Sequence, residues 1–126
     1  MDLMEQAQRQ AKAMLGIGVP KRVFVCSPLR GDYEANTRKA RGFCLAVMVA
    51  GHVPYAPHLL FTQFLDDTKA DEREAGILMG LFELSRCDEL WAFIPASGPS
   101  EGMAKEIAFA ERNQIPVVRI RTEKEA

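Results

Sequence analysis

Short segments dominated by apolar residues recur along the chain, and the segments between them are long enough to form a helix. Residues 22–26 and 89–94 are such segments, and continuous apolar runs of this length are typical of strands buried on both faces. Residues 115–120 predict a last strand of the same kind. The segment 53–57 is extended but holds two prolines, which cannot donate to a strand ladder. We therefore predict three core strands and, second in sequence, a weaker one.

The longer segments between these strands place apolar residues at helical spacing. Residues 34–50, 72–86 and 101–113 each predict a helix, and residues 58–64 predict a turn or two of helix. A further helix is predicted over residues 1–15. The inward-facing positions that the periodicity predicts are Ala40, Phe43, Cys44 and Val47 in the first long helix and Ala75, Leu78, Met79, Leu81 and Phe82 in the second.

Strand and helix alternate from residue 22 onwards, which predicts an α/β domain of three layers. We expect its sheet to be mostly parallel, with four to five strands, in a Rossmann-like or flavodoxin-like arrangement. The domain is predicted to span residues 21–126, and residues 1–20 are predicted to form an N-terminal helix and a linker. That helix packs outside the core or against a second subunit, or it is a loosely attached extension.

The composition is that of an ordinary globular protein, because 48% of the 126 residues are hydrophobic and 26% are charged. A formal net charge of -1 and the lack of a basic block argue against a nucleic-acid polymer as partner. No apolar run reaches the ~20 residues of a membrane helix, and the N-terminus lacks the pattern of a signal peptide. We therefore expect a cytoplasmic protein that does not bind membranes.

The cysteines Cys26, Cys44 and Cys87 lie in apolar segments and are widely spaced. Three cysteines at this spacing match neither a disulfide framework nor a zinc pattern, so we expect buried free thiols. No pair of His, Asp or Glu has convincing metal-site spacing, and no phosphate-binding P-loop is present. The sequence therefore predicts neither a metal nor a cofactor.

Polar residues follow the first and third predicted strands, at the edge of a parallel sheet where ligands bind. Arg30 beside Gly31 could hold a phosphate or carboxylate with backbone N–H groups, or it is a surface arginine in a turn. Tyr55 and His58 could reach the same edge, although His58 is also interpretable as a surface or capping residue. The candidates in the two loops and helix starts are Ser27, Arg30, Asp32 and Asn36 in the first, and Ser97, Ser100, Gly102 and Glu106 in the second.

Glu106 lies just inside the helix that follows the Pro/Ser/Gly loop 95–99. Free N–H groups at the start of that helix favour an anion there. Gly102 and Ala110 lie four residues to either side on one helix row, so small neighbours leave open space beside the carboxylate. Such a carboxylate could attack a sugar carbon, where bond cleavage develops positive charge. The alternative is a solvated helix residue whose small neighbours allow close packing.

Three segments carry a family resemblance: VFVCSPLRG at 23–31, CDELWAF at 87–93 and SEGMAKEIAFA at 100–110. They resemble motifs of the nucleoside 2-deoxyribosyltransferase superfamily, which includes the 2′-deoxynucleoside 5′-phosphate N-hydrolases, and most of all an uncharacterised bacterial and phage branch. The resemblance covers about residues 22–120. It implies a parallel α/β fold, a nucleoside or nucleotide as ligand, and a homo-oligomer in which a neighbouring subunit often completes the site.

The resemblance also implies roles for individual residues. Glu106 stands where the family carries its nucleophile, which attacks C1′ of the deoxyribose. In the phosphate-hydrolase branch the loop after the first strand and a serine before the nucleophile hold the 5′-phosphate. The residues here that match those positions are Ser27, Arg30, Gly31 and Ser100.

One position departs from the family pattern. Family enzymes carry an Asp that assists the leaving base, about two helical turns before the acidic residue that opens the third strand. The matching residue here is Gly80, while Glu74 and Glu83 lie on the same helix at other positions. Either another group substitutes, with Asp32 and His58 as candidates, or the protein binds a nucleotide-like ligand without turning it over.

Three functions are therefore open. The first is an enzyme that transfers or hydrolyses the N-glycosidic bond of a nucleoside or nucleoside 5′-monophosphate, with Glu106 as nucleophile and Asn36 as an orienting residue. The second is a non-catalytic module that binds a nucleotide or an ADP-ribose-like ligand. The reason to consider it is that Gly80 stands in place of the family's Asp. The third is a structural or oligomeric protein with Glu106 at a subunit interface.

Overall fold

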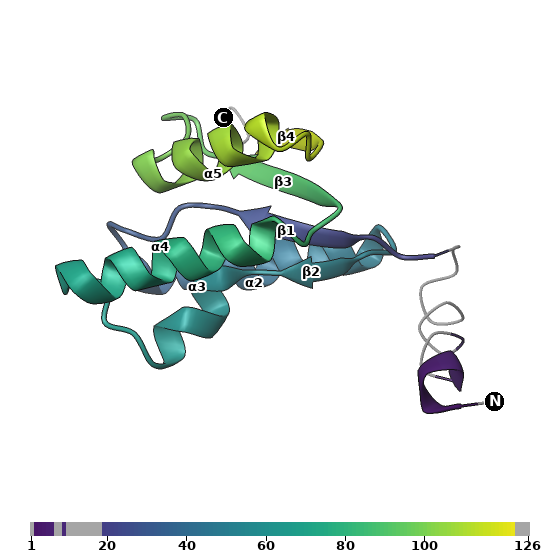
Figure 1. The fold of residues 1–126 in the computed structure, drawn as a ribbon. Coiled ribbons are helices and arrows are strands. Elements are labelled where there is room, and N and C mark those ends of the chain that lie inside the picture. Colours follow the sequence, from purple (N-terminus) through teal and green to yellow (C-terminus); the bar gives the residue numbers. More distant parts are fainter. Residues whose placement is uncertain (1, 7–8, 10–18, 123–126) are drawn as a thin grey trace.

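The computed structural model describes residues 2–6, 9 and 19–122, and its layers are visible in Figure 1. A sheet of four strands lies between helices on both of its faces. The strands are β1 Arg22–Cys26, β2 Val53–Tyr55, β3 Glu89–Ile94 and β4 Val117–Arg121. The helices are α2 Tyr33–Val49, α3 Pro57–Leu60, α4 Ala70–Leu84 and α5 Glu101–Arg112, with a 3₁₀ turn η1 Phe61–Gln63 after α3.

All strand pairs in the sheet are parallel, and the order across it is β2-β1-β3-β4. Phe24 at the centre of β1 is level with Tyr55 on β2 and with Leu90 on β3. The predicted three-layer α/β fold with a parallel sheet is confirmed. The strand β2 is only three residues long and holds one of the two prolines, Pro54, while Pro57 begins α3. The strand lies at an edge of the sheet, where a missing N–H donor is tolerated.

The side chains of β1 alternate between two cores. Phe24 and Cys26 pack with Leu84 of α4 and with α5 on one face, whereas Val23 and Val25 pack against α2 on the other. In Figure 1, α4 lies in front of the sheet and α2 behind it. All four of these β1 side chains are buried, which explains why the strand is a continuous apolar run.

The inner faces of the two long helices were predicted with different success. In α2 the predicted stripe is confirmed, since its four residues belong to the core or pack against it. In α4 the prediction is wrong for Leu78 and Phe82, which are 59% and 62% exposed. The row that faces inward contains Gly80 and Leu84. Leu78 and Phe82 are each two residues from Gly80, about 200° around the helix, and so lie on nearly the opposite side. A glycine on the inward row made the outer row look like the more apolar one.

Several boundaries also differ from the prediction. Helix α4 begins at Ala70 rather than 72, and β4 spans Val117–Arg121 rather than 115–120. Within the predicted helix 1–15, the structure describes residues 2–6 and 9, and residues 3–6 are helical. The rest of that prediction, and the tail from 123 onwards, lie outside the described residues.

The three cysteines are free thiols, as predicted; Cys26 and Cys87 are buried and Cys44 is partly exposed. Among the residues that the structure describes, no helix combines the length and the apolar character needed to cross a lipid bilayer.

Candidate functional site

The strand order places a topological switch point between β1 and β3. The chain leaves β1 toward β2 on one side and later adds β3 on the other, so the loops after β1 and β3 diverge. Ligands of parallel α/β sheets bind beyond the strand ends at such a point. A cleft of about 780 Å³ lies there, between the β1–α2 loop, helices α3 and α4, and the start of α5. Its polar lining includes Ser27, Arg30, His58, Asp67, Glu74, Ser100 and Glu106.

Glu106 lies in the second turn of α5 and lines the cleft. The residue is partly exposed, but burial of its carboxyl group raises the pKa to about 8. A hydrogen bond with Cys26, at the end of β1, acts in the opposite direction on this pKa. A Cβ placed on Gly102, one turn earlier, would meet no atom within 4 Å, while Ala110 on the same row packs in the core. Open space therefore lies beside the carboxyl group on its Gly102 side.

Ser27 and His58 meet on one wall of the cleft. Nε2 of His58 lies 2.7 Å from the carbonyl oxygen of Ser27, and because a carbonyl only accepts, Nε2 carries the proton. Burial lowers the pKa of His58, so its imidazole is neutral at pH 7. The hydroxyl of Ser27 is buried without a hydrogen-bond partner among the described residues. An unpaired buried hydroxyl costs about 1–3 kcal/mol, which a ligand that pairs with it would remove.

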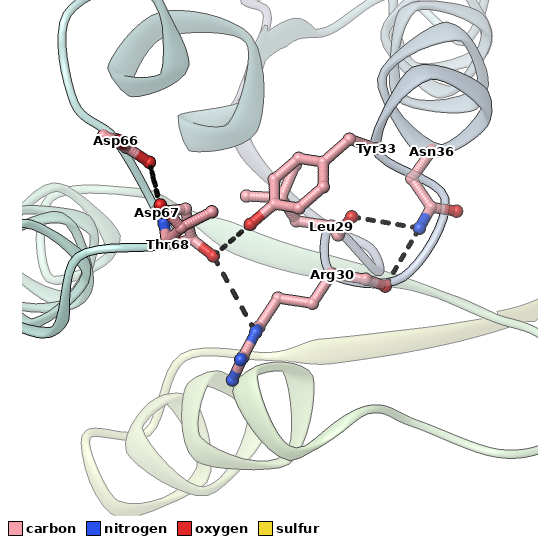
Figure 2. A network of polar contacts seen from close by, with 7 residues as sticks. All are labelled: Leu29, Arg30, Tyr33, Asn36, Asp66, Asp67 and Thr68. Atoms are coloured by element: carbon pink, nitrogen blue, oxygen red, sulfur yellow. Dashed lines mark hydrogen bonds and ion pairs between the residues drawn. The ribbon is translucent and has the colours of Figure 1, made fainter.

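Asp67 connects two loops at the cleft, as Figure 2 shows. The hydroxyl of Tyr33 donates to Oδ2 of Asp67 at 2.6 Å, and Nε of Arg30 lies 3.9 Å from the same oxygen. Burial, together with Asp67, raises the pKa of Tyr33 to about 12, so the phenol keeps its proton. The Arg30 side chain is 68% exposed, and such an ion pair contributes at most ~1 kcal/mol. The guanidinium is therefore free to turn toward an anionic ligand.

The first turn of α2 fixes the β1–α2 loop. Nδ2 of Asn36 donates to the carbonyl oxygens of Leu29 and Arg30, at 3.1 and 3.2 Å (Figure 2). Asp32 caps the helix by accepting a backbone N–H at 3.0 Å. Gly31, between Arg30 and Asp32, has a φ of 105°, and any residue with a side chain would be strained in this conformation. These three residues therefore shape the loop that presents Arg30.

A smaller cavity of about 360 Å³ adjoins the cleft, and Arg30 and Ser100 line both. Asn36 and Ser97 line this second cavity. The structure thus brings most of the predicted site residues to one edge of the sheet. Two candidates lie elsewhere: Asp32 and Tyr55 line neither cavity.

Ser100 begins α5 as its N-cap, and its hydroxyl accepts the N–H of Met103 at 3.2 Å. This bond places the hydroxyl beside the first turn of the helix, where backbone N–H groups are free and favour an anion. The hydroxyl still has its own proton to donate to a ligand.

Gly80 lies on the buried side of α4, and a Cβ placed there would lie 4.0 Å from Cβ of Pro57. Of the three glutamates on this helix, Glu72 and Glu74 line the cleft and Glu83 does not. Carboxylates other than Glu106 therefore reach the cleft from α4 and from the preceding loop, although none stands at the position of Gly80.

Sequence reasoning missed Asp67, because it lies in a polar segment that follows no predicted strand. Only the folded chain brings this loop to the β1–α2 loop, through the hydrogen bond from Tyr33, which is 34 residues away. The sequence contains no local signal for that contact. Within the part of the chain that the structure describes, no three His, Cys, Asp or Glu side chains gather as a metal site.

Known proteins match the chain at two levels. A family model described as a domain of unknown function, DUF7768, matches residues 21–120. No curated protein matches the chain. Solved structures that share the fold include a 2-deoxyribosyltransferase from Bacillus psychrosaccharolyticus and a 2-deoxyribosyltransferase from Leishmania mexicana. The first is 16% identical over 83% of this chain and 75% of its own, with a TM-score of 0.62. The second is 17% identical over 84% and 67%, with a TM-score of 0.57.

Proposed function

Because the chain belongs to the DUF7768 family and folds like 2-deoxyribosyltransferases, we propose that it transfers or hydrolyses the N-glycosidic bond of a nucleoside or nucleoside 5′-monophosphate. One observation carries this proposal: the carboxyl of Glu106 lies beside open space in a cleft at the switch point of the sheet. The unpaired hydroxyl of Ser27 in the same cleft supports a polar ligand there.

In the proposed reaction, the ionised carboxylate of Glu106 attacks C1′ of the sugar. The bond from C1′ to the base nitrogen breaks, and the base leaves with the bonding electron pair. The glycosyl-enzyme ester is then attacked at C1′ by water, which completes hydrolysis, or by a second base, which completes transfer. Both routes restore the carboxylate and develop positive charge at C1′, which a nearby carboxylate stabilises.

We assign the 5′ end of the ligand to the wall of the cleft that Ser27, Arg30 and Ser100 line. Arg30 supplies an exposed guanidinium, and Ser100 supplies a hydroxyl at the start of α5. Ser27 donates its otherwise unpaired hydroxyl, and Gly31 allows the backbone to approach closely. This arrangement supports a phosphate or a 5′-hydroxyl at that wall.

The leaving base needs a partner other than the residue at position 80. His58 is a poor acid here, because burial lowers its pKa and its Nε2 proton is used on Ser27. Asp32 is used as the helix cap. Asp67 and Glu74 both line the cleft, and we propose that one of them hydrogen-bonds to the base.

The experiment that tests this function incubates the purified protein with deoxynucleosides, ribonucleosides and their 5′-monophosphates, and separates free base by chromatography. We expect base release by the wild type and at least a 100-fold lower rate for Glu106→Gln, since the amide cannot act as the nucleophile. Equal rates for the two proteins would refute the role of Glu106 and indicate a contaminant.

A second candidate function is a non-catalytic module that binds a nucleotide or an ADP-ribose-like ligand. It is favoured by Gly80 and by the raised pKa of Glu106, which leaves most of this carboxyl protonated at pH 7. Binding with recovery of unchanged ligand across pH 6–9 supports this candidate. Base release that increases with pH toward about 8 supports the enzyme, because the ionised fraction of Glu106 increases over that range.

A further inference from the structure

The smaller cavity differs from the cleft in its charge. The cleft lining contains five carboxylates and three basic side chains, whereas the smaller cavity is lined by two basic side chains, Arg30 and Lys39, and by no carboxylate. Its neutral lining includes the hydroxyls of Ser97 and Ser100, which can donate to an anion. The residues that line it are Pro28, Arg30, Asn36, Lys39, Phe43, Phe93, Pro95, Ser97, Gly98, Pro99, Ser100 and Thr122.

Two walls of the smaller cavity are formed by packed aromatic rings and by the β3–α5 loop. The rings of Phe43 and Phe93 stack at 4.3 Å with an interplanar angle of 7°, and form an apolar wall. The β3–α5 loop turns at Gly98, whose φ of 91° places it in the left-handed region. An apolar wall beside basic groups displaces water and strengthens their attraction for an anion.

The two cavities are joined at the residues assigned to the first phosphate. Arg30 and Ser100 line both, and the backbone carbonyl of Arg30 is held by Asn36. An anion at this junction therefore has a second, positively charged volume next to it, on the side away from Glu106. Lys39 lines only that second volume and is exposed.

We propose that the smaller cavity is a second anion subsite, which accepts the β-phosphate of a nucleoside 5′-diphosphate whose sugar and base lie in the cleft. This assignment rests on the proposed function and narrows its ligand to nucleotides that carry more than one phosphate. A β-phosphate beyond the junction meets Lys39 and the N–H and O–H donors of the loop 95–100, whereas a monophosphate ends at Arg30 and Ser100.

Calorimetric titration with deoxynucleoside 5′-monophosphates and 5′-diphosphates tests the subsite on three proteins: wild type, Lys39→Ala and Arg38→Ala. Arg38 is the matched control, because it is the exposed, positively charged neighbour of Lys39 on α2 and lines neither cavity. We expect the wild type to bind the diphosphate about tenfold tighter than the monophosphate. Lys39→Ala should weaken diphosphate binding about tenfold and change monophosphate binding less than twofold, and Arg38→Ala should change neither by more than twofold.

Equal affinities of the wild type for both ligands, or equal losses in Lys39→Ala and Arg38→Ala, would overturn the subsite. Failure of the proposed function is distinguishable, because Glu106→Gln reports on base release and not on this cavity. If no monophosphate binds, the cleft assignment fails, and inorganic pyrophosphate tests the cavity alone. Pyrophosphate binding that depends on Lys39 and not on Arg38 supports an anion subsite, and its absence overturns one.

Discussion

At the scale of single residues, the burial that raises the pKa of Glu106 affects both the stability of the protein and its proposed chemistry. Its carboxyl gives up a proton near pH 4.5 in an unfolded chain, but burial holds the proton up to about pH 8 in the fold. Folding therefore takes up a proton between these two values, and the free energy of unfolding decreases as the pH increases through that window. The hydrogen bond with Cys26 offsets only part of this cost.

Glu106→Gln is expected to remove this dependence, because the amide does not titrate. The variant should match the wild type near pH 5 and be more stable by about 1–3 kcal/mol at pH 9, a range already discounted for the partial exposure of the residue. Urea unfolding at both pH values measures the difference.

The matched control is Glu111→Gln, on the same helix, whose side chain is 57% exposed in an ion pair with Arg119. It should change the free energy of unfolding by less than ~1 kcal/mol at either pH. A Glu106→Gln effect that is the same at pH 5 and pH 9 would show that the carboxyl is not held protonated.

At the scale of elements, helix α4 shows where sequence reasoning loses information. Helix α2 was predicted correctly because its buried row is apolar, whereas its exposed large apolar residues are confined to the C-terminal part of the helix. In α4 the buried row contains Gly80, and the outer row carries Leu78 and Phe82, so an apolar count favours the wrong side. Periodicity located the helix to within two residues but could not show which of its two sides faces the sheet.

Gly80→Ala is expected to stabilise the protein by about 0.5–1 kcal/mol, because alanine has the higher helix propensity. The added Cβ would make an ordinary contact with Pro57 at 4.0 Å. Thermal unfolding measures the gain.

Gly42→Ala, in α2, is the comparison, since a Cβ there would meet nothing within 4 Å. Both variants should be stabilised by a similar amount. A loss of stability in Gly80→Ala alone would mean that α4 packs more tightly on α3 than the structure shows.

At the scale of the whole molecule, the four-stranded sheet leaves exposed apolar surface next to one edge. Leu45, Met48 and Val49 form a stripe on α2 with exposed fractions of 59%, 42% and 79%, and Val53 on the adjacent edge strand β2 is 48% exposed. Contiguous apolar side chains of this kind mark interaction surfaces in soluble proteins.

The homo-oligomer expected from the sequence is therefore predicted to form through this stripe. Sedimentation velocity should show association of the wild type at micromolar concentration, and Leu45→Glu should shift it toward monomer, because a buried unpaired charge is costly. Phe82→Glu, at a similarly exposed residue on α4, should leave the association unchanged. A wild type that is monomeric at all concentrations, or an equal effect of both variants, would contradict this interface.

The sequence predicted the site residues that lie at the ends of the strands better than the site residues on other elements. Ser27 and Arg30 were found because they follow a strand, and Glu106 because it lies near the start of the helix after the next core strand; parallel strands bring such positions to one edge. Asp67 and Lys39 were missed, since their positions depend on how a long loop and a helix pack across the strand ends. The hydrophobic periodicity of the sequence contains no information about contacts of that kind.

The central place of β1 in the sheet also determines when the site comes into being. The backbone N–H of Arg22 donates to Asp88, 66 residues further along the chain. At the usual pace of translation, roughly 3–13 seconds separate the synthesis of these two residues. Throughout that interval one side of β1 lacks its neighbour, and the cleft has only the walls made before β3. The cleft can therefore bind a ligand only after β3 and α5 have been synthesised, because residues of α5 line it.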